Sequence, residues 1–348
     1  MQEDGDIHGP RDRVAHALKT TSETSPPFTA RHDAGLILAG VVPYPFLLDG
    51  FHRAIGGQEP VIAALWLALA FLSPALCLAA ALRLSAQPHL LSLRRLAFAG
   101  VMAPTAYVFL GVLLYMGGSP VPDEIVWLIL WVPICVFANL HPRSAGAVKP
   151  VPAALRVAHG IAAALVSVYV LFHLGNHLFG LIGPERHLAV MKLGRLVYRN
   201  PFVEPLLVAL MLFQIGSGLV LAWRWSAKPL EGFRVFQLAS GFYLSLFILG
   251  HMNSVFVFAR AFLHIQTDWA FATGGPAGLI QDPWNIRLVP HYWLGAFFVL
   301  SHLASGFRVV LAAHGVDRRT VTGAWAAGLL ASAAIATLIL MGMCGVRL

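Results

Sequence analysis

The stretch Phe233–Ser254, "FRVFQLASGFYLSLFILGHMNS", decides the fold class of this chain. No charged residue stands between Arg234 and Arg260, and a helix needs about 20 predominantly apolar residues to cross the hydrocarbon core of a bilayer. We therefore expect a transmembrane helix over 232–262, long enough to tilt or to project beyond the membrane. One histidine, His251, lies well inside it.

The composition of the whole chain agrees with a membrane protein. Of its 348 residues, 58% are hydrophobic and 11% are charged, and the mean hydropathy is +0.72, whereas about a quarter of the residues of a soluble domain are charged. The sequence thus predicts an all-α, polytopic membrane helix bundle with the lipid bilayer as its partner. The net charge of +8 is interpreted as loop charge that sets topology and meets anionic lipid, and no nucleic acid is expected.

Apolar runs predict about nine spans. The first is interrupted by Pro43 and Pro45, so a re-entrant or interfacial segment is the alternative there. The predicted spans are 34–50, 61–83, 96–117, 122–140, 153–182, 201–224, 232–262, 288–312 and 321–344.

The chain divides into four parts by polarity and by its Pro and Gly content. Residues 1–33 form a polar cytoplasmic tail, and 34–140 form a four-span region of unknown role. Residues 141–152 form a linker, and 153–348 form a five-span bundle that holds the histidines buried in apolar sequence.

Positive charges predict the topology. With nine spans, 16 of the 24 Lys and Arg residues fall on the side of the N-terminus, which places the N-terminus in the cytoplasm of a bacterium and the chain in its inner membrane. If the first segment does not cross, the orientation inverts for everything after it. One loop opposes the rule, because residues 183–200 carry Arg186, Lys192, Arg195 and Arg199 on the outer side.

Four histidines lie well within apolar sequence, and each is a functional candidate because ionisable groups are costly inside a membrane. They are His173, His177, His251 and His302. The spans before residue 141 contain no histidine in their interiors.

Two pairs of spans repeat each other. Aligning "LFHLGNHLF" with "LGHMNSVFV" matches His173 with His251, and aligning "FQIGSGL" with "SHLASGF" matches Gln214 with His302. With a helical rise of about 1.5 Å per residue, His173 and His251 lie at one depth toward the outer side, and Gln214 and His302 lie together at a deeper level. Two histidines facing each other across a four-helix bundle are the ligands that a six-coordinate haem iron needs.

The stretches Phe233–Ser254 and His291–Leu311, "HYWLGAFFVLSHLASGFRVVL", resemble the cytochrome b membrane anchor of succinate dehydrogenases and fumarate reductases, most closely the single-subunit type with two haems. The resemblance covers residues from about 150 to 345. It implies a four-helix haem-binding core plus one flanking helix at the C-terminal end. The region before it has no counterpart in that family.

Carried over by position, the resemblance implies that His173 and His251 ligate the iron of an outer haem b. His302 matches one ligand of an inner haem, and Gln214 stands where the other should be. Glutamine is not an ordinary haem ligand, so one haem b is expected, with Gln214 and His302 forming a polar pocket for a quinone. His177 is a further candidate beside the cofactor, although hydrogen bonding within the bundle is the favoured interpretation for it.

The resulting hypothesis is electron transfer between a quinone and a redox partner subunit outside this chain. No flavin or dinucleotide fingerprint and no iron–sulfur cysteine pattern is present in the sequence, so the chain is not expected to oxidise succinate by itself, and its status as an enzyme stays open. The alternative is a haem-free membrane anchor, assembly subunit or transporter on the same scaffold, which Gln214 and the extra spans favour. Zinc at His173 and His177 ranks below both, since no nearby carboxylate supports it.

Overall fold

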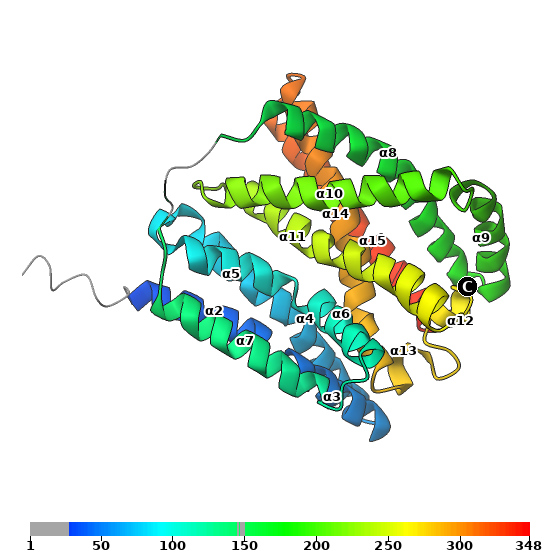
Figure 1. Cartoon of the computed structure of the whole chain (residues 1–348). Coiled ribbons are helices and arrows are strands. Elements are labelled where there is room, and N and C mark those ends of the chain that lie inside the picture. The colour runs from blue at the N-terminus through cyan, green and yellow to red at the C-terminus, as the bar shows by residue number, and fades with distance from the viewer. Residues whose placement is uncertain (1–27, 145, 147–149) are drawn as a thin grey trace, which may run out of the picture.

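The computed structural model describes residues 28–144, 146 and 150–348, and every regular element in these ranges is a helix (Figure 1). Most of the predicted tail lies outside the described residues, as does part of the predicted linker. The α-helices are α2 (Phe28–Val41), α3 (Tyr44–Gly56), α4 (Pro60–Arg83), α5 (Leu91–Val101), α6 (Ala103–Met116), α7 (Asp123–Leu140), α8 (Ala153–Leu178), α9 (Pro184–Tyr198), α10 (Val203–Ser226), α11 (Gly232–Met252), α12 (Trp269–Ala272), α13 (Gly278–Gln281), α14 (Leu288–Ala313) and α15 (Arg318–Met343).

Short helices of other types join several of these. Four are 3-10 helices, and the last, η4, is a π-helix that continues α11. They are η1 (Leu84–Ala86), η2 (Pro88–Leu90), η3 (Phe179–Leu181), η5 (Asn285–Arg287) and η4 (Asn253–Phe262).

In the described residues, seven helices are long and apolar enough to cross a membrane, so the chain is a multi-pass membrane protein. They lie where the sequence predicts spans, and the predicted helix over 232–262 is present as α11 followed by η4. The seven segments are Pro60–Ala86, Asp123–Leu140, Ala153–Leu181, Val203–Ser226, Gly232–Phe262, Asn285–Ala313 and Arg318–Met343.

The other two predicted spans are each a bent pair of helices. α2 and α3 meet at 44° next to Pro43, and η2–α5 meets α6 at 66° just before Pro104. Proline lacks the backbone N–H that a continuous helix would use and clashes with the preceding turn. Proline therefore accounts for both bends.

The helices form two regions that differ in packing. α2 to α7 pack on one another around a large apolar core, and we call them the N-terminal region. The other region is a ring, in which α8 packs on α10, α10 on α11, α11 on α14, α14 on α15, and α15 on α8. We call it the C-terminal ring.

The two regions meet along α11. α4, α5 and α6 pack on it, and the rings of Phe98 on α5 and Phe242 on α11 stack at 5.4 Å between centroids. A second connection joins the segment before α14 to the start of α7, where Arg287 and Asp123 form an ion pair of 2.6 Å. The interface is thus both apolar and charged.

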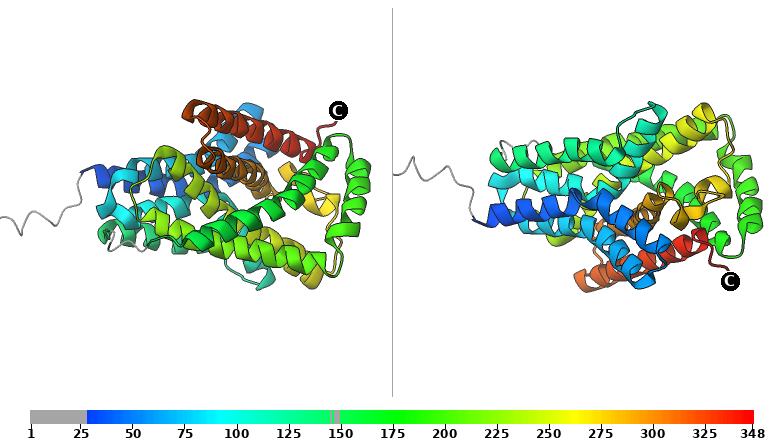
Figure 2. Two further views of the ribbon diagram at one scale, coloured as in Figure 1. Left: turned by 90° about the horizontal axis from the view of Figure 1, so that it is seen from above. Right: turned by 90° about the horizontal axis from the view of Figure 1, so that it is seen from below.

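The two ends of the bundle carry different elements. α2 begins at one end, which we call the α2 end, and α9 lies across the other, which we call the α9 end (Figures 1 and 2). The α2 end is tied together by hydrogen bonds from the Arg94 guanidinium to the carbonyl oxygens of Ser85 and Lys228. The C-terminus lies at the α9 end, where the Leu348 amide donates to the Leu181 carbonyl.

Candidate functional site

The imidazoles of His173 and His251 face each other inside the C-terminal ring. α8 carries His173 and α11 carries His251, and these two helices are not neighbours in the ring. Their ring centroids lie 6.0 Å apart, and their planes meet at 66°. The structure thus brings together the pair that the internal repeat predicts.

This separation matches one six-coordinate iron. A metal–nitrogen bond of about 2.0 Å places the centre of an imidazole roughly 3.1 Å from the metal, so two imidazoles on opposite sides of one iron have centroids about 6 Å apart. Each ring can rotate about its own metal–nitrogen bond, so an angle of 66° between the planes is compatible with shared ligation. Both side chains are half-buried, so neither is sealed by its neighbours.

Aromatic side chains one turn away orient both imidazoles. Tyr169 stacks on His173 with centroids 5.6 Å apart and planes at 20°. Phe247 stacks on His251 at 6.0 Å and 10°. Residues four apart share a helix face, so each imidazole is held by a ring on its own helix.

Two further histidines continue from His173 toward the α9 end. His177 lies 4.8 Å from His173 between ring centroids and 5.3 Å from His187 on α9. The Asn176 amide donates to Nε2 of His187 over 3.2 Å. Nδ1 of both His177 and His187 is buried and has no hydrogen-bond partner among the described residues. His173, His177 and His187 therefore form a file of imidazoles leading out of the ring.

His187 lies in α9, outside the membrane-spanning segments, and burial is the main cause of its altered acidity. Burial and the positive charge of Arg195 lower the pKa of His187 to about 4, against a smaller opposing effect of Asp268. The side chain is only 3% exposed and packs against Trp269 at 4.6 Å between ring centroids. His187 is therefore neutral at physiological pH.

On the opposite side of His251 lies His291, at the start of α14. Both histidines contact Phe247, whose ring centroid is 6.0 Å from that of His251 and 4.7 Å from that of His291. The Tyr243 hydroxyl donates to the His291 carbonyl over 3.2 Å. Nδ1 of His291 has no partner among the described residues, and sequence reasoning did not select this histidine.

The predicted pair Gln214 and His302 lies at a second, hydrogen-bonded level of the ring. The Gln214 amide donates to the backbone carbonyl of His159 on α8 over 2.8 Å. Nδ1 of His302 lies 2.9 Å from the Ser240 hydroxyl on α11. Gln214 thus ties α10 to α8, while His302 ties α14 to α11.

His159 is a member of this inner level that sequence reasoning missed. Its Nδ1 lies 2.8 Å from the Ser217 hydroxyl, which itself donates to the Phe213 carbonyl over 2.5 Å. Because that hydroxyl hydrogen is used, Nδ1 of His159 carries the donating proton, and Nε2 keeps its lone pair. A spacing of 14 residues between His159 and His173 is close to four helical turns, and this is the pattern that would have revealed it.

His302 has the same arrangement. The Ser240 hydroxyl donates to the Gln237 carbonyl over 3.0 Å, so Nδ1 of His302 is the donor to Ser240 and Nε2 is the acceptor. Two imidazoles at the inner level thus present acceptor nitrogens.

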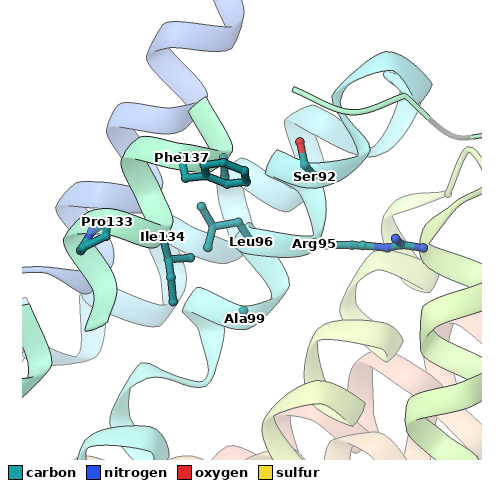
Figure 3. Close-up of a pocket in the computed structure, with 8 residues that line it drawn as sticks. Ser92, Arg95, Leu96, Ala99, Pro133, Ile134 and Phe137 are labelled. Carbon is teal, nitrogen blue, oxygen red and sulfur yellow. The ribbon is translucent and has the colours of Figure 1, made fainter. Parts of the chain in front are cut away.

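A surface groove lies away from these histidines. It has a volume of about 560 Å³ and runs between α5 and α7, where Leu96, Ile134 and Phe137 line it (Figure 3). Arg95 points away from α7 in Figure 3, and its guanidinium lies 3.4 Å from the Trp223 ring centroid on α10. The groove is open and apolar, which suits a lipid chain and offers no chemistry.

The donor set at His173 and His251 fits a haem better than a bare metal ion. Among the described residues, no group of three or more His, Cys, Asp or Glu side chains is arranged to hold a metal. A structural zinc site takes four protein ligands, whereas a haem iron takes only its axial ligands from the protein. Two facing imidazoles match the number of axial ligands that such an iron would need.

Comparison of the chain with models of protein families, with curated proteins and with solved structures found no match. A function for the chain must therefore be inferred from the geometry of the C-terminal ring.

Proposed function

We propose that this chain is a membrane cytochrome b-like protein that holds one haem b between His173 and His251. It exchanges electrons with a quinone and with a redox partner subunit, in the inner membrane of a bacterium. Each bent helix pair crosses the membrane once, which makes nine crossings, with the N-terminus in the cytoplasm. The observation that carries the proposal is the 6.0 Å separation of the two imidazole centroids.

The bound haem would accept and donate single electrons. The chain's own part is to supply two neutral imidazoles and to keep their orientation through the stacked rings of Tyr169 and Phe247. The ring of apolar helices keeps the site away from bulk water, and axial ligation and burial set the potential of a haem.

The inner level supplies a site for the quinone. Nε2 of His159 and of His302 keeps a lone pair that can accept a hydrogen bond, so both suit the hydroxyl groups of a quinol. Oxidation of a quinol releases two electrons and two protons, and an imidazole with a free lone pair can take a proton. His159 and His173 are separated by about 21 Å along α8, so the two levels are distinct sites joined by one helix.

The test is a haem assay on the purified full-length protein expressed with ample haem precursor. We expect about one haem b per chain, with absorption bands that sharpen on reduction. His173→Ala and His251→Ala should each lower the haem content at least tenfold, while His302→Ala should retain it. A haem-replete preparation without reducible bands would contradict the proposal.

A haem-free transporter, anchor or assembly subunit is the second candidate. The two bent helix pairs favour it, because transporters use broken helices near their substrate sites. The hydrogen bonds of Gln214 and His302 also serve plain helix–helix contact. If His173→Ala and His251→Ala change neither the absorption spectrum nor the thermal stability, this candidate replaces the first.

A further inference from the structure

Three arginines gather at the α9 end. Arg195 and Arg199 come from α9 and its C-terminal boundary, and Arg260 comes from the π-helix η4. The guanidinium groups of Arg195 and Arg199 both donate to Thr267, over 3.0 Å to its carbonyl and 2.9 Å to its hydroxyl respectively. The positive charges are thus fixed in place and turned inward.

A pocket of about 320 Å³ opens beside them. It is lined by Arg199, Arg260, His264, Ile265, Gln266 and Thr267. The Nε atoms of Arg195, Arg199 and Arg260 are buried and have no hydrogen-bond partner among the described residues. A pocket lined by the two arginines Arg199 and Arg260 is suited to a ligand that accepts hydrogen bonds and carries negative charge.

The carboxylates nearby neutralise only part of the charge of the three arginines. Glu204 pairs with Arg260 over 2.9 Å. Asp268 accepts a hydrogen bond from the Phe271 amide at the start of α12, and Arg195 and Arg199 have no ion pair among the described side chains. Burial first, and then the charges of Arg195 and Arg260, lower the pKa of Arg199. The three arginines therefore keep an excess of positive charge over the one carboxylate that pairs with them.

The surroundings of the pocket are apolar and face outward. α9 lies across the end of the bundle in both figures and exposes Leu193, Leu196 and Val197, which are 67%, 77% and 65% exposed. Phe262, at the end of η4, is 46% exposed. A helix that presents leucines while lying across a membrane bundle sits in the interfacial plane, where headgroups meet acyl chains.

We infer that this pocket binds the phosphate of an anionic phospholipid, with Arg199 and Arg260 on the headgroup and the acyl chains along the exposed side of α9 and η4. An amphiphile fits both observations, because it carries an anion and an apolar tail at the same point. Within the loop 183–200, which opposes the positive-inside rule, Arg199 lines the pocket, whereas Arg186 and Lys192 lie at the surface.

The test is native mass spectrometry of the full-length protein titrated with phosphatidylglycerol or with phosphatidylcholine. The wild type should bind phosphatidylglycerol more tightly. Arg199→Gln should weaken that binding about fivefold, which is the contribution of one arginine near an anionic surface. This residue is the choice because it takes part in no ion pair in the described structure, so its loss leaves no carboxylate unpaired.

The matched controls are Arg186→Gln and Lys192→Gln, which make the same change of charge on α9 at exposed positions. They should leave the affinity unchanged, and inorganic phosphate should not displace the lipid. Equal weakening by a control would reduce the effect to general surface charge and overturn the inference. Displacement by phosphate alone would assign the site to a free anion.

A third outcome separates this inference from the proposed haem. If Arg199→Gln lowers the haem content and leaves lipid binding intact, the arginines hold the carboxylates of the cofactor, and the lipid inference fails. Arg199→Lys, which keeps the charge without the planar fork, should bind lipid with intermediate affinity. It keeps the test valid if the glutamine variant does not fold.

Discussion

The N-terminal region and the C-terminal ring are built from similar apolar helices, yet α8 and α10 of the ring bury far fewer side chains than the helices of the N-terminal core. Tyr44, Phe98 and Trp127 in the N-terminal region are fully buried, with 0% exposure. In the ring, the buried residues of α8 are only Ala162 and Asn176, each 5% exposed. The imidazoles of the ring are half-buried for the most part, although His291 is 4% exposed.

The polar side chains of the two regions can be compared in the same way. The N-terminal region uses them as connections, since Asp33 pairs with Arg83 over 2.6 Å and the Trp127 indole donates to the Val41 carbonyl. In the described structure, buried polar atoms without a partner occur in both regions, among them the Tyr44 hydroxyl in the N-terminal region and Nδ1 of His177 and His291 in the ring. Leaving such an atom unpaired costs about 1–3 kcal/mol. The ring differs in that its interior also holds two imidazoles that face each other, those of His173 and His251.

The largest expected effect concerns the ion pair that joins the two regions. Arg287 and Asp123 are only 8% and 20% exposed. Arg287→Met leaves the Asp123 charge unpaired, so we expect the free energy of unfolding to fall by about 4 kcal/mol. Thermal unfolding in detergent micelles measures this.

The control for the ion pair lies at the surface. Arg53 and Asp49 pair over 2.9 Å with side chains 78% and 48% exposed, so Arg53→Met should change stability by less than about 0.5 kcal/mol. Adding Asp123→Asn to Arg287→Met should recover part of the loss. Equal effects at the two pairs would mean that the regions do not depend on this connection.

The next effect tests the packing contrast. Phe98→Ala removes a fully buried ring that stacks on Phe242 across the interface, and we expect a loss of about 3 kcal/mol. Phe307→Ala in α14, where the ring is 59% exposed, should lose less than about 0.5 kcal/mol. Chemical denaturation of both variants measures their losses in free energy of unfolding. Similar losses would contradict the difference in packing between the two positions.

The smallest effect is a pH dependence at the α9 end. The pKa of His187 is about 4 in the folded protein and about 6.5 when unfolded. The unfolded chain therefore binds this proton first, and the stability present above pH 6.5 is lost as the pH falls toward 4.

The variant that isolates this proton is His187→Gln, whose side-chain oxygen can still accept from Asn176. Its unfolding free energy should fall less steeply than that of the wild type between pH 6.5 and 4, by at most about 1.4 kcal/mol per pH unit. Unfolding curves at several pH values give the slopes. Parallel slopes would show that His187 is not held neutral.

The fold was largely predictable from the sequence, because helix length and apolar content are local properties. The 232–262 segment shows this, since its bounds follow from the absence of charge between Arg234 and Arg260. The bends were harder, because Pro43 and Pro104 mark the breaks without giving the angles of 44° and 66°.

The residues of the site were predictable only where the internal repeat aligns a residue of one span with a residue of another. The match of His173 with His251 anticipated a contact between them, and the structure has it. The match of Gln214 with His302 did not anticipate that each bonds to a different helix, because hydrogen-bond partners depend on tertiary packing. His187 lies in a polar segment outside every predicted span, so neither hydropathy nor spacing pointed to it.

The most direct measurement of the central claim is electron paramagnetic resonance of the oxidised protein, purified with its haem. If two imidazoles from α8 and α11 share one iron, the wild type shows a low-spin ferric signal, and either His173→Ala or His251→Ala abolishes it. A high-spin signal in the wild type, or a low-spin signal that survives both substitutions, would show that these histidines do not hold the metal.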